Sequence, residues 1–217
     1  MIDQELWIFG YGSLIWKNND FKFELKEPGY IKNYERKFFQ NSIDHRGTLE
    51  NPGRVVTLVQ SSDPNARVYG IGKKFTTSCS VSGIFYWLLS GYKIPNNCKE
   101  QVLEHLDFRE KNGYERCKVK FYPDSDDSSV KDIVIYVAKK ENPSFNHSSN
   151  LNDIAHQIFH ATGPSGTNRE YLYNLANAMR LIYPTKDDPH LFELETILRR
   201  MEADSDSIKR STYSQEG

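Results

Sequence analysis

Apolar and polar residues alternate along much of the first half of the chain, which is the pattern of strands that bury one face. Turn-forming residues separate these segments, most densely over residues 44–53 and 123–129, where we expect loops. The second of these loops is acidic and joins two strands into a hairpin-like pair. The predicted strands cover residues 6–9, 30–39, 54–59, 83–89, 114–122 and 132–138.

Apolar residues at helical spacing appear later in the chain, with Asn96 or Asn97 able to cap the first helix. A Gly-Pro-Ser-Gly break ends the second helix, and Thr167 or Asn168 can cap the third. Strands and helices do not alternate regularly, so the order predicts a mixed α+β domain around a small curved sheet or barrel. The predicted helices cover residues 97–109, 150–161, 168–181 and 189–201.

The length and polarity of the chain bound its organisation. Its 217 residues can fill one hydrophobic core, which predicts a single domain over residues 1–203. Residues 63–82 are polar, irregular and rich in serine and threonine, which is typical of a surface insertion. Residues 204–217 form a polar C-terminal tail that we expect to be frayed.

The charge balance and the cysteines argue against several classes of protein. A net charge of −1 and the lack of a basic stripe predict no nucleic-acid partner. No signal-peptide pattern and no apolar run of about 18–20 residues is present, so we expect no membrane partner. Three cysteines without CxxC spacing fit free thiols in a reducing compartment better than a disulfide framework or a zinc site. We therefore expect a cytoplasmic protein.

The first candidate for chemistry is the glycine-flanked turn Gly10-Tyr11-Gly12-Ser13, which follows a predicted strand. Its backbone N–H groups are little obstructed and can form a nest for an anion. A tight turn between strands is an equally good interpretation of these four residues. The turn lacks the GK[ST] of a P-loop and the second glycine of a GxSxG nucleophile elbow. Ser13 as a nucleophile has no evident His/Asp pair nearby.

The second candidate is Glu110, within the segment DFREKNGY. It stands at the end of a predicted helix, next to a glycine turn. A helix C-terminus disfavours the charge of a carboxylate, and partial burial adds to this effect. Both would raise the pKa of Glu110 toward the range of a general base. The alternative is a solvated glutamate in an alternating charge run.

Other polar clusters allow weaker hypotheses. Arg46 and Arg54, on turn-rich segments, can bind a carboxylate, or they can hold the loop through local salt bridges. His156 and His160 are spaced i,i+4 on a predicted helix, but no HExxH carboxylate pattern accompanies them. We therefore expect no metal and no other cofactor.

Five blocks of sequence together resemble the ChaC-type γ-glutamylcyclotransferase family. They stand in the order of the family and span about residues 7–198. One short block would be weak, whereas five in order make chance agreement remote. The blocks are residues 7–16 (WIFGYGSLIW), 44–47 (DHRG), 51–58 (NPGRVVTL), 106–114 (LDFREKNGY) and 163–172 (GPSGTNREYL).

The resemblance implies an α+β, γ-glutamylcyclotransferase-like fold, a small mixed β-barrel surrounded by helices. It also implies an activity that converts glutathione into 5-oxoproline and cysteinylglycine without a cofactor. The catalytic glutamate of the family falls on Glu110. The γ-glutamyl-binding loop of the family falls on Ile8, Phe9, Gly10, Tyr11, Gly12, Ser13 and Leu14.

One region departs from the resemblance. Between residues 59 and 83 the chain is longer than the compact members of the family. Residues 83–88 match a strand of the family, which makes residues 69–82 a surface insertion that can reshape one rim of the pocket.

Three alternative functions stay open. The enzyme can be a cyclotransferase for other γ-glutamyl amino acids or amines, since the sequence does not specify the pocket. It can be a non-catalytic binding module on the same fold, or a serine hydrolase that uses Ser13. Nothing in the sequence specifies an oligomeric state.

Overall fold

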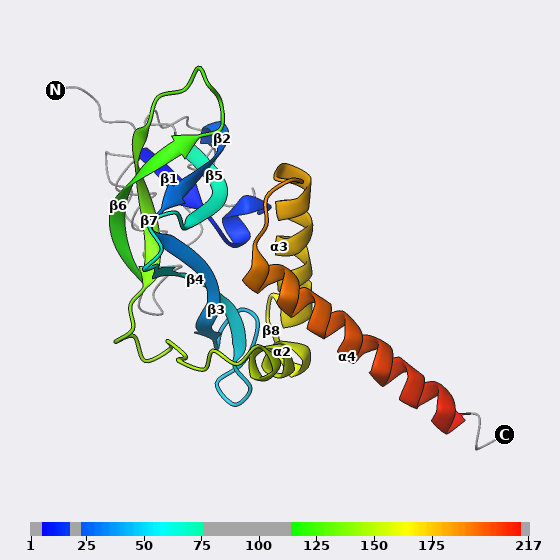
Figure 1. Ribbon diagram of the computed structural model, residues 1–217. Coiled ribbons are helices and arrows are strands. Elements are labelled where there is room, and N and C mark those ends of the chain that lie inside the picture. Colours follow the sequence, from blue (N-terminus) through cyan, green and yellow to red (C-terminus); the bar gives the residue numbers. More distant parts are fainter. Residues whose placement is uncertain (1–5, 18–22, 76–113, 214–217) are drawn as a thin grey trace, which may run out of the picture. The chain divides into compact units, whose positions relative to one another are not determined.

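The computed structural model describes residues 6–17, 23–75 and 114–213 (Figure 1). These residues form two compact units, which are described separately below. The first unit comprises residues 1–35 and 60–142, and the second comprises residues 36–59 and 143–217. The predicted strand at 83–89, the predicted helix at 97–109 and Glu110 all lie outside the described residues. The single domain over residues 1–203 stays a prediction.

The first unit is a closed barrel with the strand order β1-β5-β2-β6-β7 (Figure 1). The barrel is mixed, because β1 and β7 run parallel while the other neighbours are antiparallel. A short 3-10 turn, η1 (Ser13–Ile15), follows the first strand. The strands are β1 (Leu6–Gly10), β2 (Phe23–Lys32), β5 (Arg67–Phe75), β6 (Tyr114–Pro123) and β7 (Lys131–Ala138).

Aromatic rings and small residues fill the barrel together. The rings of Phe9 and Phe121, both buried, lie 5.7 Å apart between their centroids. A Cβ at Gly29 would stand 2.5 Å from the Phe121 ring, so only glycine leaves room for the ring there. The interior therefore depends on glycines as much as on apolar side chains.

The prediction of a surface insertion at residues 69–82 is wrong for residues 69–75. They belong to β5, which pairs with β1 on one side and with β2 on the other. Glycines replace the expected apolar residues of this strand because a Cβ at Gly72 would lie 2.9 Å from the Phe121 ring. The sequence of this strand therefore lacks the alternation of apolar and polar residues that would predict it. Residues 76–82 lie outside the described residues.

The predicted strand at 30–39 is divided at Asn33. This residue has a φ of 65°, in the left-handed region that asparagine tolerates better than most residues. The chain therefore turns, and a new strand, β3 (Tyr34–Ser42), begins. The strand expected at 54–59 is confirmed as β4 (Gly53–Gln60), and the pair expected around residues 123–129 is confirmed as β6 and β7.

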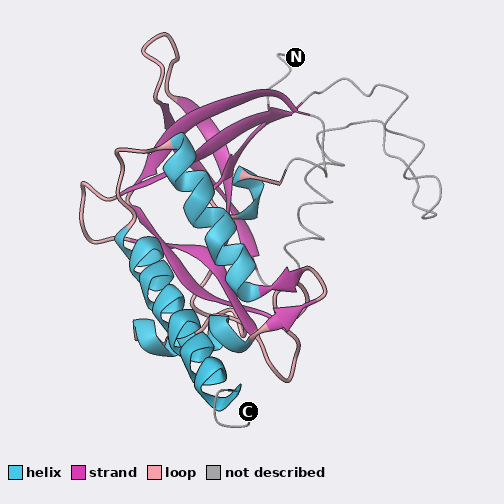
Figure 2. Cartoon of the chain, turned by 90° about the vertical axis from the view of Figure 1, so that its right-hand side faces the viewer, coloured by secondary structure: helices cyan, strands magenta, loops and turns pink. Residues whose placement is uncertain are grey.

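The second unit contains the three helices of the described chain and two small sheets (Figure 2). The helices contact one another, and their facing leucines and isoleucines are buried. Thr167 caps α3 by accepting a hydrogen bond from the N–H of Glu170, as expected. The helices are α2 (Leu151–His160), α3 (Asn168–Ile182) and α4 (Pro189–Tyr213), and the sheets pair β3 with β4 and β8 (Thr162–Gly163) with β9 (Gly166–Thr167).

The expectation of a frayed tail after residue 203 is wrong up to Tyr213, because α4 continues to that residue. The last turns are mostly polar, and their Ile208 is exposed, so they lack the apolar spacing that marks a packed helix. An i,i+3 pair of Lys209 and Asp206, with 3.9 Å between Nζ and Oδ1, accompanies this exposed part. None of the helices in the described residues is long and apolar enough to cross a membrane.

Candidate active site

The glycine loop folds back on itself directly after β1. The N–H of Ile15 donates to the carbonyl of Gly12 at 2.9 Å, and the N–H of Lys17 donates to the carbonyl of Ser13 at 2.8 Å. A Cβ at Gly10 would stand 3.0 Å from the Cβ of Leu14, so the turn closes tightly only because position 10 lacks a side chain. The structure thus brings both ends of the predicted loop into contact.

Tyr11 anchors the loop to the barrel. Its buried side chain extends to β7, where the phenolic hydroxyl donates a hydrogen bond to the backbone carbonyl of Tyr136. The Tyr11 ring also stacks at 6.5 Å from the ring of Phe9, which is buried within the barrel. Tyr11 therefore holds the loop in two ways: its ring packs on Phe9, and its hydroxyl bonds to β7.

An apolar cluster connects the loop to the start of β6. Leu6, Ile8 and Tyr136 form its buried centre. Leu14 of the loop and Tyr114, the first residue of β6, pack against this centre. Glu110 precedes Tyr114 by four residues in the sequence. Tyr114, the first described residue after Glu110, therefore belongs to the same cluster as Leu14 of the loop.

The seven predicted loop residues form one continuous part of the structure, from the buried Ile8 and Phe9 to the partly exposed Leu14. Their role in binding a substrate stays a prediction. The role of Glu110 as the acid–base residue also stays a prediction, since that residue lies outside the described part of the chain.

The structure adds a residue that the sequence analysis missed. Lys73, on β5, is only 2% exposed, and its Nζ donates to the carbonyl of Lys17 at 3.2 Å. Lys17 follows the η1 turn, so the ammonium group contacts the backbone three residues beyond Leu14, the last residue of the loop. Nothing in the polar stretch around residue 73 distinguished this lysine from a solvated one.

The hypothesis that Arg54 binds a substrate carboxylate is wrong. Arg54 is 1% exposed in the second unit, and its Nε donates to Oε1 of Gln157 at 2.7 Å. Its Nη1 donates to the carbonyl of Phe38 at 3.1 Å, and burial lowers its pKa to about 10. The backbone of Arg54 is held as well, by both polar atoms of the Asn168 side chain. Arg54 is therefore a structural residue.

Arg46 is also structural. Its Nη1 donates to the carbonyl of Thr167 at 2.9 Å and to Oε2 of Glu170 at 3.1 Å. The guanidinium group thus joins the loop at residues 44–47 to the start of α3, and the local salt-bridge interpretation of this loop is confirmed.

The remaining polar features do not form a metal site in the described chain. His156 and His160 lie on adjacent turns of α2, with ring centroids 4.5 Å apart. No group of three or more histidine, cysteine, aspartate or glutamate side chains that could hold a metal is found in the described ranges.

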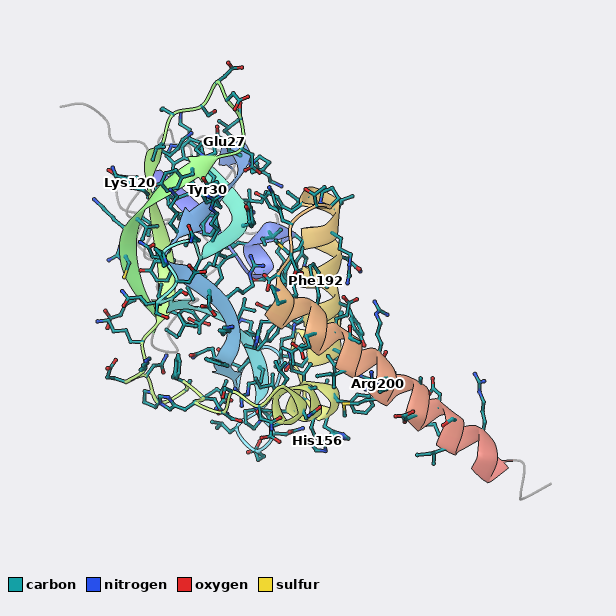
Figure 3. The ribbon with its side chains drawn as sticks, in the orientation of Figure 1. Glu27, Tyr30, Lys120, His156, Phe192 and Arg200 are labelled. Carbon is teal, nitrogen blue, oxygen red and sulfur yellow. The ribbon has the colours of Figure 1, made fainter. Side chains whose placement is uncertain are left out.

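A hollow of about 410 Å³ opens on the first unit, beside Lys32, Tyr34, Lys120 and Tyr122. Figure 3 shows Lys120 on the outer side of β6. The residues of the glycine loop do not line this hollow. It is therefore separate from the candidate active site.

Comparisons with known proteins agree with this fold. The family model described as ChaC-like protein matches residues 6–201. A zebrafish protein named "Glutathione-specific gamma-glutamylcyclotransferase 1" is 37% identical over 195 residues, which is 89% of this chain and 88% of that protein. A fission yeast protein named "Glutathione-specific gamma-glutamylcyclotransferase" is 36% identical over 90% of this chain and 93% of its own.

A solved structure shares the fold. The crystal structure of a gamma-glutamyl cyclotransferase specific to glutathione from yeast superposes with a TM-score of 0.75 at 25% identity, over 91% of this chain and 97% of that chain. The closed barrel and the helices thus define an α+β protein with the γ-glutamylcyclotransferase fold, which confirms the fold class that the resemblance implied. The chain belongs to the ChaC-like family.

Proposed function

We propose that this protein is a cytoplasmic, glutathione-specific γ-glutamylcyclotransferase, a lyase that releases 5-oxoproline and cysteinylglycine. The observation that carries the proposal is the similarity, over nearly the whole chain, to enzymes that bear this name. The intact glycine loop and its anchoring by Tyr11 support it.

The reaction asks little of the protein because the substrate contains its own nucleophile. The α-amine of the γ-glutamyl group attacks its own γ-carbonyl carbon, and a five-membered lactam closes. The amide bond to cysteine then breaks, and the amine of cysteinylglycine departs with a proton. A well-oriented intramolecular attack of this kind has an effective molarity of about 10⁵ M or more. Neither a serine nucleophile nor a cofactor is needed.

In this proposal the glycine loop holds the bent γ-glutamyl group. Backbone N–H groups can bind the α-carboxylate or the oxyanion of the tetrahedral intermediate, and one good oxyanion donor contributes about 3 kcal/mol.

Glu110 takes a proton from the α-ammonium group and returns one to the departing amine. Acid–base catalysis of this kind contributes about 10²–10⁴ in rate. The packing of Tyr114 against the same cluster as Leu14 supports this assignment, because four residues of chain span at most about 14 Å. Because Tyr114 is only four residues from Glu110, the chain length allows Glu110 to reach a substrate bound at the loop.

The proposal is tested with the purified protein and glutathione, with cysteinylglycine and 5-oxoproline both quantified. Glu110→Gln should lose about a hundredfold or more in kcat, since it removes the proton acceptor and keeps the shape. Glu115→Gln is the matched control, because Glu115 is an exposed residue of β6 that pairs with Lys139. Activity of Glu110→Gln within about threefold of wild type would contradict the assignment.

The same assay separates the alternatives. A panel of γ-glutamyl amino acids and amines measures the preference for glutathione. Turnover by the wild-type protein rules out a non-catalytic module. Full activity of Ser13→Ala rules out the serine hydrolase, because that mechanism requires the hydroxyl.

A further inference from the structure

The hollow beside Lys120 on the first unit has the size of a site for a small ligand. Its volume of about 410 Å³ lies within the range of about 300–1,000 Å³ that ligand pockets occupy. The described residues that line it all belong to the first unit, so one compact unit forms this wall. Lys32, Tyr34, Gln60, Ser61, Lys120 and Tyr122 are among them.

Two lysines place positive charge at the hollow. Lys32 ends β2, and Lys120 lies on β6 (Figure 3). The Nζ of Lys32 lies 4.3 Å from the centroid of the Tyr122 ring. Lys120 pairs with Asp132 at 2.8 Å, but these side chains are 62% and 67% exposed, and such a surface pair is weak. No carboxylate is among the described residues that line the hollow, so its charge is positive.

A row of tyrosines gives the same side of the barrel an aromatic surface. Tyr30 of β2 is opposite Tyr69 of β5 and Tyr122 of β6 in the strand register. The Tyr30 and Tyr122 rings stack, with centroids 5.2 Å apart and planes 11° from parallel. Ile31 and Phe121, the neighbours in sequence, are buried within the barrel, so the tyrosines lie on its outer face. Tyr122 lines the hollow and offers a ring to a planar ligand.

Neutral polar groups complete this wall. The side chain of Gln60 hydrogen-bonds to the hydroxyl of Tyr34. Burial raises the pKa of the Tyr34 hydroxyl, which keeps it protonated at neutral pH. The hydroxyl of Ser61 donates to Oε1 of Glu35 at 2.6 Å, so this carboxylate has a partner within the protein. Amide and hydroxyl groups of this kind can bond to the polar edge of a base or to a ribose.

We propose that this hollow binds a nucleotide, with the phosphate on Lys32 and Lys120 and the base on the ring of Tyr122. A ligand that has both a phosphate and a flat base matches the ammonium groups and the tyrosine together, whereas a bare anion matches only the ammonium groups. Lys32 exchanges the Tyr122 ring for the phosphate, because a charge-assisted hydrogen bond is stronger than an exposed cation–π contact. The residues of the glycine loop do not line the hollow, so the inference does not depend on the proposed cyclotransferase function.

The first test compares complete and partial ligands. Isothermal titration calorimetry at low ionic strength measures the binding of the four ribonucleoside monophosphates to the purified protein. At least one of them should bind with a dissociation constant below about 1 mM. Its nucleoside lacks the phosphate, and inorganic phosphate lacks the base. Each should bind at least about tenfold more weakly than the nucleotide, because each loses one half of the contacts.

The second test changes the wall of the hollow. Lys32→Met and Lys120→Met should each weaken binding of that nucleotide about tenfold, since each removes a charged partner of the phosphate. Lys118→Met is the matched control and should stay within about twofold, because Lys118 is an exposed lysine of β6 that is not among the described residues lining the hollow. Tyr122→Leu should weaken binding of the nucleotide and leave that of inorganic phosphate unchanged. Thermal unfolding checks that each variant folds, and the exposed Lys120 decides if the others do not.

Each other result overturns the inference. It is wrong if none of the four nucleotides binds below about 1 mM. Equal affinity for inorganic phosphate would make the hollow a simple anion site, and equal losses for Lys118→Met and Lys120→Met would make the effect one of general charge. A hexanucleotide that binds more than about tenfold more tightly than the mononucleotide would make the tyrosine row a surface for single-stranded RNA instead. Displacement of the nucleotide by glutathione would place the ligand in the active site. None of these results affects the proposed function, which rests on turnover of glutathione.

Discussion

The hydroxyl of Tyr11 donates a hydrogen bond to the backbone carbonyl of Tyr136, a residue 125 positions away in the sequence. This contact closes the loop after β1 onto β7, the parallel neighbour of β1 in the barrel. Because the acceptor belongs to the backbone, the bond depends on the side chain of Tyr11 alone. The phenolic hydroxyl of Tyr11 therefore anchors the loop to β7.

Tyr11→Phe should weaken the loop without opening the barrel. The ring keeps its packing on Phe9, but the hydrogen bond from its hydroxyl to the carbonyl of Tyr136 is lost, which costs about 1–2 kcal/mol of unfolding free energy. We expect kcat/KM for glutathione to fall about tenfold, because the loop loses its anchor. Urea denaturation and steady-state kinetics measure the two effects. Tyr136→Phe retains the carbonyl and is the control; equal effects of both changes would contradict this account.

Gly10→Val should abolish most of the activity while the protein still folds. A Cβ at this position would stand 3.0 Å from the Cβ of Leu14, and the valine methyl groups extend further, so the turn must open. We expect a loss of about a hundredfold in kcat/KM, which corresponds to about 2.7 kcal/mol. Circular dichroism checks the fold. Ser13→Ala, in the same loop, should stay within about twofold of wild type, since the proposed mechanism uses no serine nucleophile.

Arg54→Met should affect stability and leave substrate binding unchanged. The variant removes the donors that reach Gln157 and the carbonyl of Phe38, and each unsatisfied buried acceptor costs about 1–3 kcal/mol. The midpoint of thermal unfolding should fall, while KM for glutathione stays within about twofold of wild type. Arg200→Met, on the exposed side of α4 (Figure 3), controls for the loss of one charge. A raised KM at unchanged stability would return Arg54 to the substrate site.

Glu195 should make the second unit sensitive to acid. Burial raises the pKa of its carboxyl, but hydrogen bonds and charges from Arg180 and Arg199 outweigh burial and lower the pKa below its usual 4.5. A lowered carboxyl pKa contributes stability that is present above about pH 4.5 and is lost as the pH falls through the folded-state pKa. Glu195→Gln should therefore be less stable than wild type at pH 7, and the difference should shrink in acid.

The measurement is the urea midpoint as a function of pH. Glu193→Gln, an exposed neighbour on α4, is the control and should follow the wild-type curve. A constant difference between Glu195→Gln and wild type from pH 7 into the acid range would contradict the role of ionisation. The pH dependence thus separates the ion pairs of Glu195 from its packing.

Local pattern was enough for the elements whose two faces differ in polarity. Alternation predicted β4, β6 and β7, and helical spacing predicted α2 and α3, because each buries one side against a neighbour. Pattern failed for β5, whose interior positions are glycines that accommodate the Phe121 ring. It also failed for the last turns of α4, which bury no apolar side.

The sequence by itself determined the family, the glycine loop and the candidate Glu110, since these depend on residue identity in a local order. Only the tertiary structure decided which positively charged side chains are buried and hydrogen-bonded within the protein. Arg54 bonds to Gln157 across 103 positions, and Lys73 bonds to Lys17 across 56. Burial and hydrogen-bond partners at such separations arise from chain packing, which the local pattern of residues does not encode. For that reason the sequence alone could not show that Arg54 and Lys73 are both buried and hydrogen-bonded within the protein.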